Sequence, residues 1–200
     1  MLKTTTVPFT ISHRKVVPKT VKLNSKPEGL VIVYTGEGKG KTTAALGLAL
    51  RAAGYKKRVL IVQFGKAWFS GEVQGVKKLK PFIRLVQGGR GFVGILGDKL
   101  PEKEHKMAAQ KTYELLYKEV ISGKWDIVIA DEIVGAVSSQ LLPLSQGLRL
   151  IKDKPKNVDL VLTGHHAPEQ IIAKADLVTE MVAVKHPFEK GILAKESIDY

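Results

Sequence analysis

The chain of 200 residues contains no cysteine, so disulfide bonds, thiolate catalysis and cysteine-ligated metals are all excluded. Aromatic residues make up only 6% and do not alternate with basic residues, as a stacking platform for single-stranded nucleic acid requires. No apolar run is long enough to cross a bilayer, and the N-terminus has prolines and charges where a signal peptide has an apolar stretch. We therefore expect a cytoplasmic protein without a membrane segment.

Acidic residues are also few. The 19 Asp and Glu residues stand against 32 Lys and Arg residues, which gives a formal net charge of +13. Such an excess suits a nucleic-acid binder, a protein with polyanionic small ligands, or a lysine-rich surface of thermophilic type. The cations are dispersed, in pairs such as Lys56-Lys57 and Lys77-Lys78, and form no dense basic tract. We prefer a solvated basic surface to a nucleic-acid interface.

Residues 1–28 differ from the rest of the chain. They contain Pro8, Pro18 and Pro27, several lysines, and short β-prone pieces. We interpret them as a basic N-terminal arm, which either packs on the body or stays mobile. The arm is either a dispensable tail or a cover for the active site. Because no linker, internal repeat or low-complexity tract follows, residues 29–200 are expected to form one domain.

Short apolar runs alternate with segments of helical spacing from residue 30 onward. The apolar runs suit strands buried on both faces, and we expect strands over residues 30–34, 58–64, 82–86, 125–130, 158–162 and 177–184. Helices are expected over residues 42–53, 101–121, 144–151 and 168–175. This alternation predicts an α/β fold with a mainly parallel sheet and helices on both faces.

The long predicted helix carries three specific expectations. Pro101 suits its first position, because proline has no N–H to satisfy there. Two of its residues have specific expectations: His105 on the surface and Met107 in the core.

A glycine-lysine loop lies between the first strand and the first helix. Glycines let successive backbone amides face one anion, and the helix N-terminus adds its partial positive charge. Lys41 is placed to reach terminal phosphates, and the Thr42 hydroxyl to ligate a divalent metal. We therefore expect a triphosphate site made by Thr35, Gly36, Glu37, Gly38, Lys39, Gly40, Lys41, Thr42 and Thr43. The match to G-x-x-x-x-G-K-[ST] is imperfect, because Thr35 stands at the first glycine position.

Two adjacent carboxylates, Asp131 and Glu132, follow the apolar strand at residues 127–130. A carboxylate at the end of such a strand lies beside the phosphate loop and steadies the metal. Asp131 is therefore predicted to join Thr42 at a metal ion. The alternative is a helix N-cap aspartate with an incidental glutamate.

Several ordered motifs resemble the ATP:corrinoid adenosyltransferase family over roughly residues 31–200. The family shares the short loop with threonine before its first glycine. The resemblance implies a RecA-like phosphate-loop fold, ATP and a reduced corrinoid as substrates, and Mg²⁺ or Mn²⁺. It rests on Tyr34 to Ala45, Arg51, Gly54, Val62-Gln63-Phe64, Gly89-x-Gly91-Phe92, Asp131-Glu132-Ile133, Leu162-Thr163-Gly164, Ala175 to Val178, Val184 to Phe188, Gly191, and Ile198-Asp199-Tyr200.

The resemblance also implies a reaction. Co(I) of the corrinoid attacks C5′ of ATP, and inorganic triphosphate leaves intact. Lys41 and the loop amides would stabilise the departing charge, with Lys39 as a second cation. Catalytic and binding roles follow for the other matched positions: Arg51 at phosphate, Glu132 at the ribose hydroxyls, Phe92 on the lower corrinoid face, and His186 near the nucleotide. A flavoprotein electron donor and a homodimer are implied in the same way.

The chain departs from the family pattern at three places. Gly94 stands where members often have a tryptophan, Glu37 replaces an asparagine of some members, and His165-His166 replaces an arginine of many. Adjacent histidines rarely converge on one ion without further ligands, so we interpret these two as loop residues near the site.

Two rival functions remain beside adenosyl transfer. A RecA-like ATPase stimulated by nucleic acid would explain the loop, the acidic pair and the charge. A corrinoid or nucleotide carrier would explain the departures at Gly94 and His165. Among corrinoids, complete cobalamin, cobinamide and an earlier a,c-diamide precursor are all open as acceptors.

Overall fold

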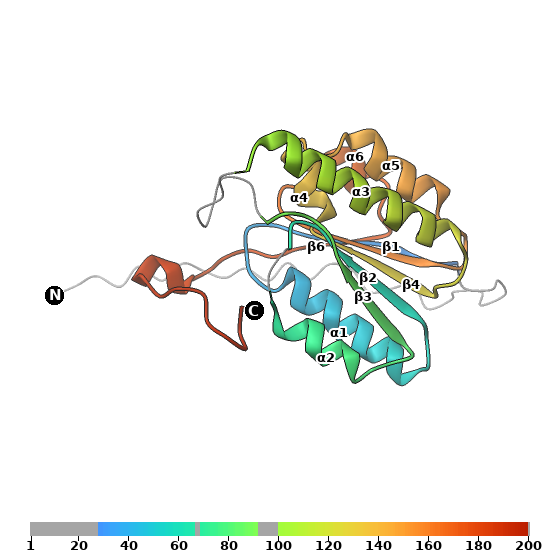
Figure 1. Ribbon diagram of the computed structural model, residues 1–200, viewed down its shortest axis with the longest axis horizontal. Coiled ribbons are helices and arrows are strands. Elements are labelled where there is room, and N and C mark those ends of the chain that lie inside the picture. Colours follow the sequence, from blue (N-terminus) through green and yellow to red (C-terminus); the bar gives the residue numbers. More distant parts are fainter. Residues whose placement is uncertain (1–27, 67–68, 92–99, 200) are drawn as a thin grey trace, which may run out of the picture.

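The computed structural model describes residues 28–66, 69–91 and 100–199, and a sheet of six strands forms their centre (Figure 1). The strands lie in the order β3-β2-β4-β5-β1-β6, and every neighbouring pair is parallel. This confirms the predicted α/β fold with a parallel sheet. The strands are β1 (Val31–Thr35), β2 (Val59–Gln63), β3 (Ile83–Gln87), β4 (Ile127–Asp131), β5 (Asp159–Thr163) and β6 (Leu177–Glu180).

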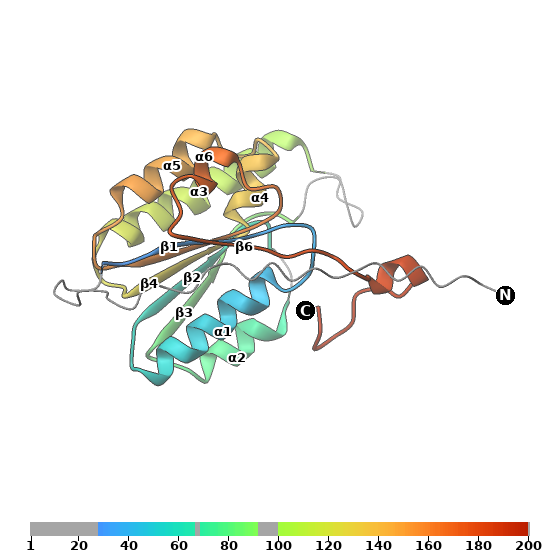
Figure 2. The ribbon, with the colours of Figure 1, turned by 180° about the vertical axis from the view of Figure 1, so that it is seen from behind.

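Helices cover both faces of the sheet, because residues on its central strands are buried alternately toward each side. On β4, Val128 and Ala130 belong to one apolar cluster, whereas Ile127 and Ile129 belong to the other. Figures 1 and 2 show α1 (Lys41–Gly54) and α2 (Gly71–Lys77) on one face. The opposite face carries α3 (Glu102–Ile121), α4 (Ile133–Ser138), α5 (Leu144–Asp153) and α6 (Glu169–Ile172).

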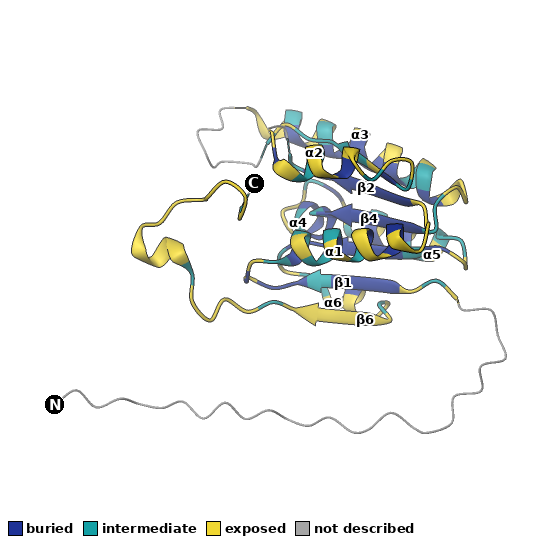
Figure 3. Cartoon of the chain, turned by 90° about the horizontal axis from the view of Figure 1, so that it is seen from below, coloured by how far each residue is buried: buried dark blue, intermediate teal, exposed yellow. Residues whose placement is uncertain are grey.

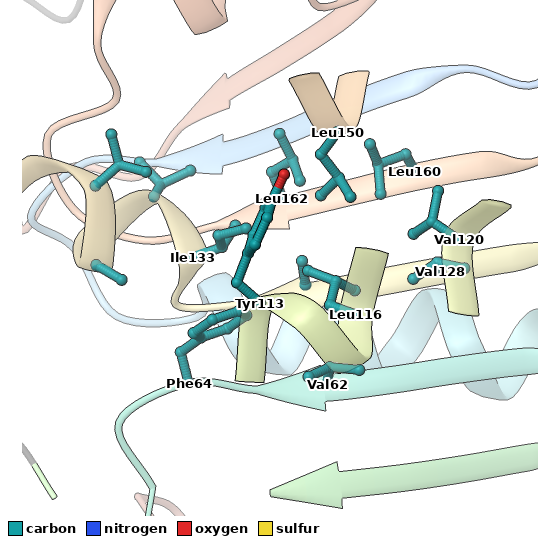
Figure 4. Close-up of a cluster of buried hydrophobic side chains, with 14 of the residues drawn as sticks. Val62, Phe64, Tyr113, Leu116, Val120, Val128, Ile133, Leu150, Leu160 and Leu162 are labelled. Carbon is teal, nitrogen blue, oxygen red and sulfur yellow. The ribbon is translucent and has the colours of Figure 1, made fainter. Parts of the chain in front are cut away.

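The larger apolar cluster joins α3 and α5 to β4 and β5 (Figure 4). Leu116 and Leu150 from the two helices are fully buried, as is Leu160 of β5. The buried Tyr113 satisfies its hydroxyl by donating to the carbonyl of Gln146 at 3.1 Å. The core thus fixes the strands whose carboxyl ends carry the polar residues described below.

The orientation of α3 corrects two expectations. His105 is buried, with 3% of its surface exposed, whereas Met107 is 53% exposed. The buried residues of this helix recur every three or four positions, and His105 lies on that stripe. Pro101 is the N-cap in extended conformation, so the helix begins at Glu102 instead of at the proline.

Strand β6 is shorter than predicted and ends at Glu180 instead of Val184. Among the described residues it pairs only with β1, and all four of its own residues are exposed (Figure 3). The chain then leaves the sheet beyond its carboxyl edge and forms the short 3₁₀ helix η1 (Pro187–Lys190). None of the helices described is both long and apolar enough to cross a membrane.

Candidate active site

The glycine-lysine loop connects the end of β1 to the start of α1, at the carboxyl edge of the sheet. Gly36 and Gly40 have φ angles of 98° and 112°, a region that residues with a Cβ rarely adopt. The loop backbone therefore curls over the N-terminus of a 14-residue helix, whose first amides have no partner within the helix. This geometry presents amides and a helix dipole to an anion.

The side chain of Lys41 folds back onto the backbone of the loop. Its side chain is 5% exposed, and its Nζ donates to the carbonyl oxygens of Gly36 at 2.7 Å and Gly38 at 2.9 Å. Burial lowers the pKa of Lys41, an effect opposed by the carboxylates of Glu132, Glu37 and Asp131. The ammonium is therefore held by loop carbonyls at the position where an incoming phosphate would meet it.

Asp131 ends β4 and is almost fully buried, with 1% exposed. Its Oδ1 accepts hydrogen bonds from the hydroxyls of Thr42 at 2.9 Å and Thr163 at 2.7 Å. Its Oδ2 accepts from the Gln63 amide at 3.1 Å. The predicted pair of Thr42 and Asp131 is thus brought together, although the two residues are 89 positions apart in the chain.

Three further residues form a polar network with Asp131, and the sequence analysis did not single them out as site residues. Gln63 ends β2 and pairs in register with Asp131, and its amide also donates to Glu72 at 3.0 Å. Lys66 binds the same Glu72 oxygen at 2.8 Å. Burial alone would raise the pKa of Glu72, but the hydrogen bonds from Lys66 and Gln63 prevail and lower it to about 2. The sequence did contain one indication for Gln63, because it is a polar residue at the end of an apolar strand.

Glu132 lines a cavity of about 520 Å³, and two other residues of its wall, His165 and His166, lie beside Glu37 of the loop. Its φ of 63° turns the chain into α4, and its N–H donates to the Thr163 hydroxyl at 2.9 Å. Burial raises the pKa of Glu132, and the neighbouring Asp131 adds to this effect. The cavity is lined by Phe64, Gly65, Gly89, Arg90, Gly91, His105, Ala109, Glu132, Gly135, Ala136, Ser138, Ser139, Leu141, His165 and His166.

The two adjacent histidines meet the phosphate loop at Glu37. His165 Nδ1 and His166 Nε2 lie 3.5 Å and 3.2 Å from the same Glu37 oxygen. Within the described ranges, no group of three or more His, Cys, Asp or Glu side chains is arranged to hold a metal ion. The histidines therefore connect the loop after β5 to the phosphate loop.

The C-terminal segment packs against the other side of the loop. The Gly38 amide donates to the Met181 carbonyl at 2.7 Å, and Lys39 forms an ion pair with Asp199. His186 caps η1 by accepting from the Phe188 amide at 3.2 Å, and it lines a hollow together with Lys39. Thus His186 lies beside the loop, on its outer flank.

Thr35 and Thr43 are the first and last residues of the predicted triphosphate site. The buried Thr35 accepts from the Ala167 amide at 3.0 Å, and Thr43 is exposed in the first turn of α1. Arg51 lies ten residues beyond Lys41 in the same helix, about 15 Å along its axis. It lines a separate hollow with Asp126 and Asp159, so the structure does not bring it to the loop of its own chain. Phe92 lies outside the described residues.

A parallel α/β sheet with a glycine-lysine loop, a buried lysine and a Thr–Asp pair at its carboxyl edge is typical of the phosphate-loop class of proteins. The family model described as "ATP:corrinoid adenosyltransferase BtuR/CobO/CobP" matches residues 27–200. The chain therefore belongs to the ATP:corrinoid adenosyltransferase family and is a transferase.

Curated relatives agree with this assignment. The corrinoid adenosyltransferase of Escherichia coli (strain K12) is 32% identical over 173 residues, 86% of each chain. Corrinoid adenosyltransferase CobA of Salmonella typhimurium is 33% identical over 174 residues, again 86% of each chain. The Pseudomonas aeruginosa corrinoid adenosyltransferase is 31% identical over 188 residues, which cover 94% of this chain and 91% of the relative.

Proposed function

We propose that this protein transfers the 5′-deoxyadenosyl group of ATP to the Co(I) centre of a reduced corrinoid and releases inorganic triphosphate. The observation that carries the proposal is the juxtaposition at the sheet edge. The loop with its buried lysine is joined to a cavity through Glu37, which lies beside the cavity-lining His165 and His166. Glu132 lines the same cavity. A triphosphate in the loop would direct the ribose carbon toward a second substrate in that cavity.

In this reaction the loop holds a leaving group. The electron pair of Co(I) forms the bond to C5′, and the C5′–O bond breaks with its electrons on the triphosphate oxygen. The amides of residues 36–40 and the Lys41 ammonium would stabilise the charge that grows there. On the side of the loop that faces the C-terminal segment, Lys39 would add a second positive charge, and His186 would make a polar contact with the nucleotide.

The oxygen donors beside the loop fit a divalent metal such as Mg²⁺ or Mn²⁺. Magnesium is bound by one or two carboxylates together with substrate phosphates, and by oxygen ligands only. Thr42 and the buried Asp131 supply a hydroxyl and a carboxylate 2.9 Å apart. They would hold the ion, which when bound supplies positive charge to the leaving triphosphate.

Glu132 is proposed to accept hydrogen bonds from the ribose hydroxyls. Its carboxylate lies in the cavity wall, and its backbone is fixed by the Thr163 hydroxyl at 2.9 Å. The cavity volume of about 520 Å³ lies within the range of small-molecule sites. Phe92 stays a sequence-based proposal for the corrinoid side.

The family resemblance supports two further proposals, a flavoprotein as electron donor for Co(I) and a homodimeric assembly, and the composition of the chain supports a third, a cytoplasmic location. Strand β6 and the segment after it expose large apolar residues such as Leu177, Val182 and Val184, which supports association with another chain. Light scattering of the purified protein would test the dimer.

The test of the reaction is anaerobic. Purified protein, ATP, Mg²⁺ and chemically reduced cobalamin or cobinamide are mixed, the visible spectrum is followed, and triphosphate is assayed in parallel. A light-sensitive alkylcorrinoid spectrum with equimolar triphosphate is the expected result. Orthophosphate release stimulated by DNA, without alkylation of either corrinoid, would overturn the proposal in favour of an ATPase.

A further inference from the structure

Asp131 is not the only carboxylate that faces Lys66. The ammonium lies 2.8 Å from Glu72 Oε1 and 3.8 Å from Asp131 Oδ2. The side chains of Lys66 and Glu72 are each 14% exposed, and that of Asp131 is 1% exposed. One cation is therefore shared unequally by two largely buried anions, and the nearer partner is Glu72.

The hydrogen bonds of Asp131 come from neutral groups. Thr42 and Thr163 donate to Oδ1, and Gln63 donates to Oδ2. Neutral donors orient a carboxylate without cancelling its charge. Because Lys66 makes its hydrogen bond to Glu72, Asp131 keeps a negative charge that a divalent cation could use.

The position of Glu72 is fixed by its helix and by hydrogen bonds. Glu72 lies in the first turn of α2, which lies on the same face of the sheet as α1 (Figure 1) and packs on β3. The Gln63 amide donates to Glu72 at 3.0 Å and to Asp131 at 3.1 Å, so one buried amide sets the spacing of the two carboxylates. Gln63 in turn accepts from Gln87 at 3.2 Å, which fixes its orientation.

We propose that Glu72 is a positioning residue that holds the Lys66 ammonium closer to itself than to Asp131 and so keeps Asp131 available to the divalent metal of the nucleotide site. Without the Glu72 charge, Asp131 would be the nearest carboxylate left to Lys66, and the ammonium would compete with the metal for it. This inference rests on the proposed metal role of Asp131.

The experiment measures ATP binding by calorimetry as free Mg²⁺ is varied, with the full chain and without corrinoid, so that no turnover occurs. Glu72→Gln keeps the shape and one acceptor oxygen but removes the charge. We expect the Mg²⁺ concentration for half-maximal ATP binding to rise about tenfold, the effect typical of losing a group that orients a metal ligand. Glu102→Gln, at an exposed ion pair on α3, is the matched control and should leave this concentration unchanged.

The decisive variant combines Glu72→Gln with Lys66→Met. Removing the competing cation should return the Mg²⁺ requirement to within about threefold of the wild-type value, although both partners of the ion pair are then gone. If Glu72 only supported the local structure, the double variant would be at least as impaired as the single one, and that result would overturn the inference.

Asp131→Asn separates the inference from the proposed function. If Asp131→Asn changes the Mg²⁺ requirement but Glu72→Gln does not, the positioning role of Glu72 is wrong and the metal proposal stands. If Asp131→Asn has a wild-type Mg²⁺ requirement, the metal proposal fails, and the role of Glu72 fails with it.

Discussion

Lys41 shows at the scale of one residue how the loop is prepared for its ligand. A buried ammonium is stable only when its hydrogen bonds are satisfied, and the carbonyls of Gly36 and Gly38 satisfy two of them. An incoming triphosphate offers stronger, charged acceptors at the same place. On binding of triphosphate, the lysine ammonium would exchange the loop carbonyls for phosphate oxygens. Because the side chain is already ordered, little side-chain conformational entropy would be lost.

Replacing this lysine is the most direct test of the loop. For Lys41→Ala we expect ATP affinity to fall by about 10- to 100-fold, because a hydrogen bond to a charged group contributes about 1.5–3 kcal/mol. Triphosphate release with reduced cobalamin should fall in parallel. Calorimetry and a triphosphate assay measure the two effects. Lys57→Ala, an exposed cation near the far end of α1, controls for the loss of one positive charge. Wild-type affinity in Lys41→Ala would remove the loop from the mechanism.

From the pKa of the Glu72 carboxyl we predict how the free energy of unfolding depends on pH. Its pKa falls from 4.5 to about 2 on folding, so the folded state favours the ionised form. The resulting stabilisation is fully present above the unfolded pKa and is lost as the pH falls toward 2. A shift of this size corresponds to at most about 3–4 kcal/mol.

Glu72→Gln should therefore lower the free energy of unfolding at pH 7, measured by urea denaturation, by about 1–3 kcal/mol. The difference between wild type and variant should shrink in a series of buffers below pH 4.5. A difference that stays constant down to pH 3 would show that the charge of Glu72 does not contribute.

At the scale of elements, the β1–loop–α1 unit depends on close contact with the segment after β6. A Cβ on Gly38 would lie 2.8 Å from the carbonyl carbon and oxygen of Met181, closer than real Cβ contacts. The Gly38 amide also donates to the Met181 carbonyl at 2.7 Å. Glycine is needed here for space, because the neighbouring backbone has no flexible side-chain end that could yield.

Gly38→Ala should therefore displace the loop from Met181. We expect ATP affinity to fall about tenfold and the free energy of unfolding to fall by about 1–3 kcal/mol, as for other overpacked sites. Gly47→Ala in α1 is the matched control, because its Cβ would meet nothing within 4 Å. That substitution should stabilise the helix by about 0.5–1 kcal/mol and leave ATP binding unchanged. Equal ATP affinities in the two variants would contradict the steric argument.

The elements that were predicted from the sequence are those with strong apolar patterns. All six strands and the helices α1, α3, α5 and α6 were expected, and the structure contains each of them. The short helix α2 was missed because its seven residues include Gly71 and Gly75 and one buried side chain, Val76. Helix α4 was missed because it begins directly after β4, through the left-handed conformation of Glu132, without a turn sequence.

The site could be predicted only where local sequence defines it. The loop and Asp131 follow from the order of strand, turn and helix. The network of Gln63, Lys66 and Glu72 depends on the pairing of β2 with β4 and on the place of α2, which no local pattern specifies. Arg51 was assigned from the resemblance alone, and the length of α1 carries it away from the loop of its own chain.

At the scale of the whole molecule, the site joins the carboxyl ends of four strands. Thr35, Gln63, Asp131 and Thr163 are the last residues of β1, β2, β4 and β5. These strands are neighbours at the centre of the sheet, and their apolar residues form the core on both sides. A ligand that binds across their ends contacts the native fold and not the unfolded chain, so binding and folding are coupled.

Bound nucleotide should therefore stabilise the entire protein. At 100 times its Kd, Mg²⁺-ATP adds about 2.7 kcal/mol to the free energy of unfolding. For a chain of this size that corresponds to a rise in Tm of about 5–10 °C, measured by thermal denaturation. Because the loop is proposed to hold all three phosphates, Mg²⁺ with inorganic triphosphate should also raise Tm, whereas adenosine alone should not. In Lys41→Ala, the rise in Tm with ATP and the rise with triphosphate should both be lost. A rise in Tm with a DNA oligonucleotide but none with ATP or triphosphate would contradict the proposed ligand and attribute the +13 charge to nucleic-acid binding.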